Sequence, residues 1–119
     1  MGEMVGELNY NRILVPLDGS DESKSVLPYI RDLSPRFGSE VHILGVCIGS
    51  KRRRINELLE EYINDLSNEL IQDSVKAKPV IIYGRPAEKI LAYTKENDID
   101  LVLMSTHGRS GVARWWKKV

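Results

Sequence analysis

Four short apolar runs divide the chain, and the first three are each followed by apolar residues that recur at helical spacing. The runs span residues 12–17, 41–46, 79–83 and 101–104. Runs of this length that end in turn-forming residues are typical of buried β-strands. Because proline has no backbone N–H, we expect Pro16 to close the first strand.

The segments between the runs predict three helices. The first contains Pro28, which predicts a kink or a late helix start, because proline in a helix interior removes a hydrogen bond. The second spans Ile55 to Leu70, and the third begins at Pro86, a favoured first position for proline. The third helix is expected to turn Ala87, Ile90, Leu91 and Thr94 inward.

The alternation of strands and helices indicates the fold class. Apolar strands joined by helical crossovers favour an α/β domain, in which a doubly wound parallel sheet is covered on both faces. Residues 1–10 predict a flexible N-terminal lead-in, and residues 11–119 predict one domain with a single core.

Composition narrows the class of protein. The 17 basic and 17 acidic side chains cancel, which disfavours nucleic acid as a partner, because phosphate neutralisation needs an excess of cations. Cys47 is the single cysteine and lies among apolar residues, so we expect a buried thiol and no metal site. No apolar run reaches the roughly 18 residues of a membrane span. The first residues carry acids and no hydrophobic stretch, so we expect no secretory signal and a cytoplasmic protein without membrane contact.

The fourth apolar run leads into a polar turn that carries Gly108 and Gly111. Glycines at this spacing let backbone N–H groups face outward without a Cβ in the way, and that geometry suits a phosphate. Open α/β sheets place their ligands where a parallel strand enters such a turn. The sequence therefore predicts a nucleotide site at this end of the sheet.

Three segments carry a resemblance to a known family: ILVPLDGS at 13–20, VIIYGRPAEKI at 80–90 and LMSTHGRSG at 103–111. In this order and spacing the chain resembles the universal stress protein family over residues 11–114. The resemblance implies a Rossmann-like sheet of the adenine nucleotide alpha hydrolase-like type, with strand order 3-2-1-4-5. We expect the fifth strand and the last helix to be missing here, which leaves the order 3-2-1-4 with strand 4 at the edge.

The resemblance also implies a ligand, because many members bind ATP, with or without Mg²⁺, at the carboxyl edge of strands 1 and 4. By position, the implied nucleotide-binding residues are Pro16, Asp18, Val46, Met104, Ser105, Gly108, Arg109 and Gly111. The first three would contact the adenine and ribose, the next two would lie beneath the nucleotide, and the last three would hold its phosphates. Asp18 is also a candidate Mg²⁺ ligand.

Two features depart from the ATP-binding pattern. Those members carry a further glycine and hydroxyl residue nine positions after the glycine pair, which here would fall beyond Val119. Ser105 stands where glycine is usual, and its side chain would either crowd the nucleotide or donate a hydrogen bond to it. Trp115 and Trp116 lie where a covering helix would begin. They indicate either burial in a partner or a shortened chain with a disordered tail.

Two other sequence features are given structural rather than functional roles. The basic run at 51–54 is interpreted as a solvated loop rather than an anion-binding rim. His107 is interpreted as a residue that orients the glycine turn rather than as a catalytic base.

Our leading hypothesis is an ATP-binding regulatory module in stress response, with at most slow ATP hydrolysis, since neither an activated nucleophile nor a water-positioning carboxylate is evident. The alternative is a dimeric interaction or scaffold member of the same family that binds no nucleotide. Its edge strand and tryptophans would recruit a partner protein. A homodimer is expected in both cases.

Overall fold

A computed structural model describes residues 10–20, 22–49, 53–105 and 113–117. The strands are β1 (Arg12–Pro16), β2 (Glu40–Cys47), β3 (Lys76–Tyr83), β4 (Leu101–Ser105) and β5 (Ala113–Lys117). The helices are the 3-10 helix η1 (Glu22–Val26) and the α-helices α2 (Leu27–Phe37), α3 (Arg53–Gln72) and α4 (Pro86–Glu96). The predicted alternation of strands and helices is therefore confirmed.

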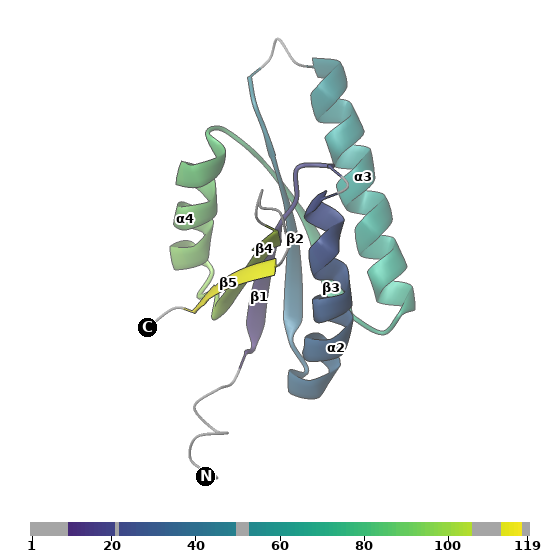
Figure 1. Ribbon diagram of the computed structural model, residues 1–119. Coiled ribbons are helices and arrows are strands. Elements are labelled where there is room, and N and C mark those ends of the chain that lie inside the picture. Colours follow the sequence, from purple (N-terminus) through teal and green to yellow (C-terminus); the bar gives the residue numbers. More distant parts are fainter. Residues whose placement is uncertain (1–9, 21, 50–52, 106–112, 118–119) are drawn as a thin grey trace.

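The strands form one sheet in the order β3-β2-β1-β4-β5. The pairs β3–β2, β2–β1 and β1–β4 are parallel, which confirms the predicted doubly wound arrangement of four strands. In Figure 1, α2 and α3 lie on one side of the sheet and α4 lies on the other.

The outer side of β4 departs from the expectation. β5 pairs with β4 in the antiparallel direction, with Leu103 opposite Trp115 and Val102 opposite Trp116. The expectation that strand 4 forms the sheet edge is therefore wrong, because β5 takes that place (Figure 1, yellow strand). The physical reason is that β4 offers an unpaired row of N–H and C=O groups, and an aromatic segment has a high β-propensity.

The first helix starts late, as Pro28 predicts. Glu22–Val26 forms a 3-10 helix, and α2 begins at Leu27, so Pro28 lies in the first turn, where a missing N–H costs little. At the other end Gly38 adopts a left-handed conformation with φ of 62°, and its N–H donates to the carbonyl of Ser34. Glycine takes this conformation at little cost, which ends the helix cleanly.

The sheet buries an apolar cluster on each face. Beneath α2 and α3, the fully buried members include Ile13, Val15, Ile30, Val41, Ile43, Ile63 and Leu70. Beneath α4, the cluster consists of Leu14, Leu44, Tyr93, Ile99 and Val102. Successive residues of each strand serve opposite faces, and so β1 contributes Ile13 and Val15 to one cluster and Leu14 to the other.

The inner face of α4 differs from the prediction at three positions. Ala87 was expected to turn inward and is exposed. Leu91 is 53% exposed, whereas Tyr93 is only 8% exposed and belongs to the apolar cluster beneath the helix. Ile90 packs partly against the same cluster, and the hydroxyl of the buried Thr94 donates to the carbonyl of Ile90 at 2.7 Å. The helix is therefore rotated relative to the predicted apolar stripe.

β3 lies at one edge of the sheet and contains Pro79 in its middle. The N–H of Gly84 donates to Cys47 of β2, and alternate residues of a strand hydrogen-bond to the same side. Position 79, an odd number of residues before Gly84, therefore directs its nitrogen away from β2. Because that side has no partner strand among the described residues, the missing N–H of Pro79 breaks no ladder bond.

Candidate nucleotide site

Pro16 determines where β1 and β4 stop pairing. The carbonyl of Arg12 accepts a hydrogen bond from Asp100 at 2.9 Å, on the β4 side, whereas the carbonyl of Asn11 accepts from Glu40 of β2 at 2.8 Å. Alternate residues of β1 thus bond to β4 and to β2, and Pro16, four positions after Arg12, lies on the β4 side. Proline has no N–H to donate, so it cannot continue the ladder with β4.

The β1–β4 ladder reflects this interruption. Its partners are Ile13 with Leu101 and Leu14 with Val102, although β1 continues to residue 16 and β4 to residue 105. On the other side β1 remains bonded to β2, because the N–H of Leu17 donates to the carbonyl of Leu44 at 2.9 Å. The carboxyl ends of β1 and β4 are the switch point of the sheet, where ligands of open α/β folds bind.

Asp18 follows directly after β1 at this switch point. Its Oδ1 accepts the backbone N–H of Ser20 at 2.9 Å, and Gly19 between them has a φ of 86°. A Cβ at position 19 would come no closer than 3.7 Å to Leu59, so glycine is needed for its backbone angle rather than for space. The turn fixes the Asp18 carboxylate at the carboxyl edge, where the side chain is exposed.

Three of the predicted residues share one face of the sheet. Leu14, Leu44 and Val102 point into the cluster beneath α4. Pro16, Val46 and Met104 stand two positions further along the same strands and so face the same side. Pro16 and Val46 are partly exposed, and Met104 is 37% exposed. We call Pro16, Val46 and Met104 the apolar row.

Sequence reasoning missed a fourth residue of this face. Ile82 of β3 is the ladder partner of Val46 and packs partly against the cluster beneath α4. It therefore extends the apolar row by one strand. The signal available in the sequence was the alternation of the third apolar run, which puts Val80 and Ile82 on the same face.

The remaining predicted residues fall at or beyond the end of β4. Ser105 is the last residue of β4 and is the ladder partner of Ala113 in β5. Gly108, Arg109 and Gly111, together with His107, lie outside the described residues. The structure thus brings Pro16, Asp18, Val46, Met104 and Ser105 to one edge of the sheet.

Asn56 of α3 holds the loop after β2 and was also missed. It is 5% exposed; its Oδ1 accepts the N–H of Ile48 at 3.3 Å, and its Nδ2 donates to the carbonyl of Gly49 at 3.0 Å. A buried amide that meets one donor and one acceptor fixes the loop backbone at the end of the strand that carries Val46. A single asparagine in an amphipathic helix gives no sequence signal for this role.

Cys47 matches its interpretation as a buried thiol, whereas the described part of the basic run forms the first turn of α3 rather than a loop. Cys47 is 1% exposed, and burial, followed by the charge of Glu60, raises the pKa of its thiol. Arg53 and Arg54 are exposed, and Arg53 pairs with Glu57 one turn away at 3.7 Å. Lys51 and Arg52 lie outside the described residues. The described part of the run is a solvated surface.

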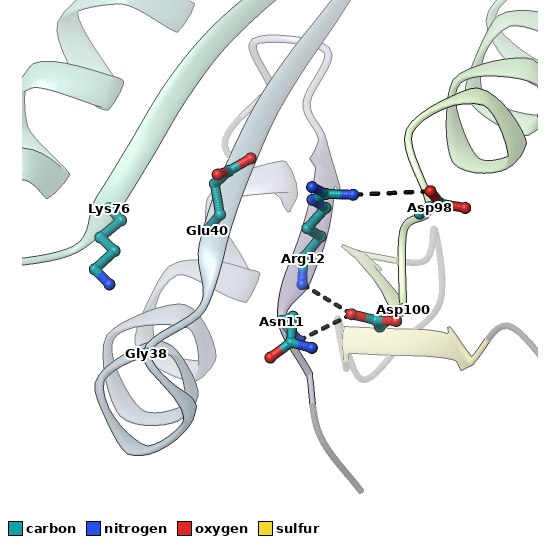
Figure 2. Close-up of a pocket in the computed structure, with 7 residues that line it drawn as sticks. All are labelled: Asn11, Arg12, Gly38, Glu40, Lys76, Asp98 and Asp100. Carbon is teal, nitrogen blue, oxygen red and sulfur yellow. Dashed lines mark hydrogen bonds and ion pairs between the residues drawn. The ribbon is translucent and has the colours of Figure 1, made fainter.

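A hollow of about 450 Å³ lies at the opposite, amino edge of the strands (Figure 2). Its lining residues are Asn11, Arg12, Gly38, Glu40, Lys76, Asp98 and Asp100. The carboxylate of Asp100 accepts the N–H groups of Asn11 and Arg12, both at 2.9 Å, and so ties the start of β4 to β1. Among the described residues no group of three potential ligands is arranged to hold a metal ion.

A model of the universal stress protein family matches residues 9–116. The chain belongs to the universal stress protein family. The matched range contains all three segments on which the sequence resemblance rests, and it confirms that resemblance.

Known universal stress proteins resemble the chain over most of its length. The protein MJ0531 of Methanocaldococcus jannaschii is 26% identical, over 92% of this chain and 72% of that protein. A crystal structure of a family member from Burkholderia pseudomallei superposes with a TM-score of 0.72 at 20% identity, over 84% of each chain. A universal stress protein crystallised in complex with cAMP gives a TM-score of 0.67 at 17% identity, over 86% of this chain and 77% of that one. At these identities the structural likeness supports the universal stress protein fold.

Every helix that the structure describes is too short or too polar to cross a membrane.

Proposed function

We propose that this universal stress protein binds an adenine nucleotide and acts as a regulatory module. The observation that carries the proposal is the position of the apolar row beside the Asp18 turn, where the β1–β4 ladder ends. A partly exposed apolar surface next to a fixed carboxylate suits a ligand with a flat base and a hydroxylated sugar.

Each part of the nucleotide has a candidate partner. The base would lie against Pro16, Val46 and Met104, which present apolar surface on three neighbouring strands. The Asp18 carboxylate would accept hydrogen bonds from the ribose hydroxyls. Hydrogen bonds accepted by a charged carboxylate are stronger than those between two neutral groups.

The phosphates would bind at the turn after β4. Gly108 and Gly111 would supply backbone N–H groups, Arg109 a guanidinium group and Ser105 a hydroxyl. If the nucleotide carries Mg²⁺, Asp18 is the carboxylate at this edge that would hold it with the phosphates. The cAMP complex supports this class of ligand, because it joins an adenine nucleotide to a chain of the same fold.

Calorimetric titration of the full chain with ATP, AMP and cAMP, with and without Mg²⁺, tests the proposal. We expect binding of at least one nucleotide, and roughly tenfold or greater weakening in Asp18→Ala. Asp18→Asn keeps an oxygen for the Ser20 N–H while removing the charge, so it separates turn geometry from charge. Asp65→Ala, on the exposed face of α3, is the matched control. Absence of heat at millimolar nucleotide, or equal affinity in Asp18→Ala and Asp65→Ala, would refute the proposal.

One observation favours a second candidate, a strand-mediated homodimer. β5 is the end strand of the described sheet, and an uncovered edge invites pairing with another chain. In the scaffold alternative, the edge strand that pairs with a partner is therefore β5 rather than β4. Light scattering over a hundredfold concentration range should show a monomer–dimer equilibrium, and Arg114→Pro should shift it toward monomer. A strictly monomeric chain would exclude this candidate.

A further inference from the structure

A chain of three polar side chains crosses the buried interface between β2 and α4. Glu40 Oε1 lies 2.6 Å from His42 Nε2, and His42 Nδ1 lies 2.5 Å from the hydroxyl of Tyr93. His42 is 3% exposed and Tyr93 is 8% exposed. The Glu40 end reaches the amino-edge hollow, where Figure 2 shows its carboxylate. The proposed nucleotide contacts use none of these groups.

The donors and acceptors of these three side chains form one consistent set of hydrogen bonds. An ionised carboxylate only accepts hydrogen bonds, so His42 Nε2 carries the proton that Glu40 accepts. A neutral imidazole has one N–H, and Nδ1 is then an acceptor for the Tyr93 hydroxyl. In this arrangement each of the three polar groups has a partner, and a neutral imidazole would adopt the Nε2–H tautomer.

The three hydrogen-bonded side chains matter for α4 because this helix has few other buried contacts with the sheet. It is 11 residues long, and Tyr93 is its one large apolar side chain that is buried among the described residues. Ile90 is partly buried, and Leu91 is 53% exposed. The hydroxyl that bonds to His42 thus belongs to the same side chain that α4 buries in the apolar cluster beneath it.

The contact also reaches the proposed base-binding face. Val46, of the apolar row, and Ile82 both pack against the cluster to which Tyr93 belongs. His42 lies on β2 four residues before Val46 and faces the same side of the sheet. A displacement of α4 would change the packing beneath both Val46 and Ile82.

We propose that Glu40, His42 and Tyr93 form a latch that sets the position of α4 on the sheet, which makes His42 and Tyr93 positioning residues for the nucleotide. The latch itself is independent of any ligand. Its effect on binding rests on the proposed function.

Hydrogen exchange of the full chain tests the latch in the absence of ligand. Tyr93→Phe removes one hydroxyl and keeps the ring, so the apolar contact remains. We expect amides of residues 90–97 to exchange roughly three- to tenfold faster, in keeping with the loss of one buried hydrogen bond, while α3 exchange stays unchanged. Tyr29→Phe, at a side chain 46% exposed on α2, is the matched control. Equal protection of α4 in both variants would overturn the latch.

Nitrogen-15 spectra of the wild-type ring test the hydrogen-bond directions. We expect the ring N–H on Nε2, with Nδ1 accepting the hydrogen bond from Tyr93. A protonated Nδ1 would overturn the assignment, because Tyr93 could then not donate to it.

Nucleotide titration of the same variants tests the positioning role. We expect affinity to fall in Tyr93→Phe and not in Tyr29→Phe. Faster α4 exchange with unchanged affinity would overturn the positioning role and leave the latch standing. A wild-type chain that binds no nucleotide would refute the proposed function, and the exchange result would still decide the latch.

Discussion

The Nε2 atom of buried His42 lies 2.6 Å from a carboxylate oxygen of Glu40, whose own side chain is 49% exposed. The hydrogen bond from His42 is the main cause that holds the pKa of Glu40 below its usual range, and the nearby charges of Arg12 and Lys78 act in the same direction. A carboxyl group with a lowered pKa in the folded state contributes stability above the unfolded-state pKa and loses it as the pH falls through the folded value.

Glu40→Gln should therefore change the acid limb of the stability curve. In the wild type, this contribution is lost as the pH drops below about 4.3, the ordinary pKa of glutamate. We expect urea midpoints of Glu40→Gln to fall less steeply below this pH than those of the wild type. Glu88→Gln, at an exposed site on α4, serves as the control and should follow the wild-type curve. Parallel acid limbs for all three proteins would contradict the assignment.

Asn56→Ala should destabilise the loop after β2. The substitution leaves the N–H of Ile48 and the carbonyl of Gly49 without their side-chain partner, a loss of about 1–3 kcal/mol. Denaturant unfolding measures the total loss, and hydrogen exchange of Ile48 should locate it. Asn68→Ala, on the exposed face of the same helix, should be neutral or slightly stabilising, since alanine is the better helix former. Equal stability of the two variants would show that the hydrogen bonds of Asn56 to the loop contribute nothing to the free energy of unfolding.

The thiol of Cys47 should react slowly with a disulfide reagent in the folded protein. Burial raises its pKa and leaves it 1% exposed, so little thiolate is present or accessible at pH 8. We expect labelling to follow the rate of unfolding and to become fast in denaturant. Rapid native labelling at pH 8 would contradict the burial.

Ile82→Ala should weaken nucleotide binding, because Ile82 extends the apolar row. Loss of part of an apolar contact of this size is expected to reduce affinity by a few-fold, at about 25 cal/mol per Å². Ile71→Ala, at a side chain 50% exposed on α3, should leave affinity unchanged. If both variants bind ATP or cAMP equally well, Ile82 does not face the base.

Local sequence patterns predicted much of this fold. The apolar runs predicted β1, β2 and β4, although β3 begins at Lys76, three residues before the predicted run. Pro28 predicted the late start of α2, and Pro16 predicted the end of β1. These features depend on prolines, which lack a backbone N–H, and on short runs of apolar residues. Both can be read from the sequence without knowledge of distant contacts.

Contacts between distant residues were less predictable. Tyr93 turns inward, where its hydroxyl lies 2.5 Å from Nδ1 of His42, a residue 51 positions earlier, whereas helical spacing alone favoured Leu91. β5 forms through pairing with β4, whereas the sequence led us to expect strand 4 at the sheet edge. For the site, the family resemblance implied Pro16, Val46 and Met104, and strand alternation explains why they share one face. The hydrogen bonds of Asn56 to the loop after β2 have no local signature in the sequence.

Pro79 gives the described sheet two unlike borders. At the β3 border, the amide that would be offered outward at position 79 does not exist, and the exposed Lys76 and Lys78 lie on the same strand. A neighbouring molecule can therefore not add a regular strand there, whereas β5 presents no such obstacle in its backbone path. If copies of this protein pair through one sheet edge alone, association ends at two molecules, and the architecture would then resist polymerisation into fibres.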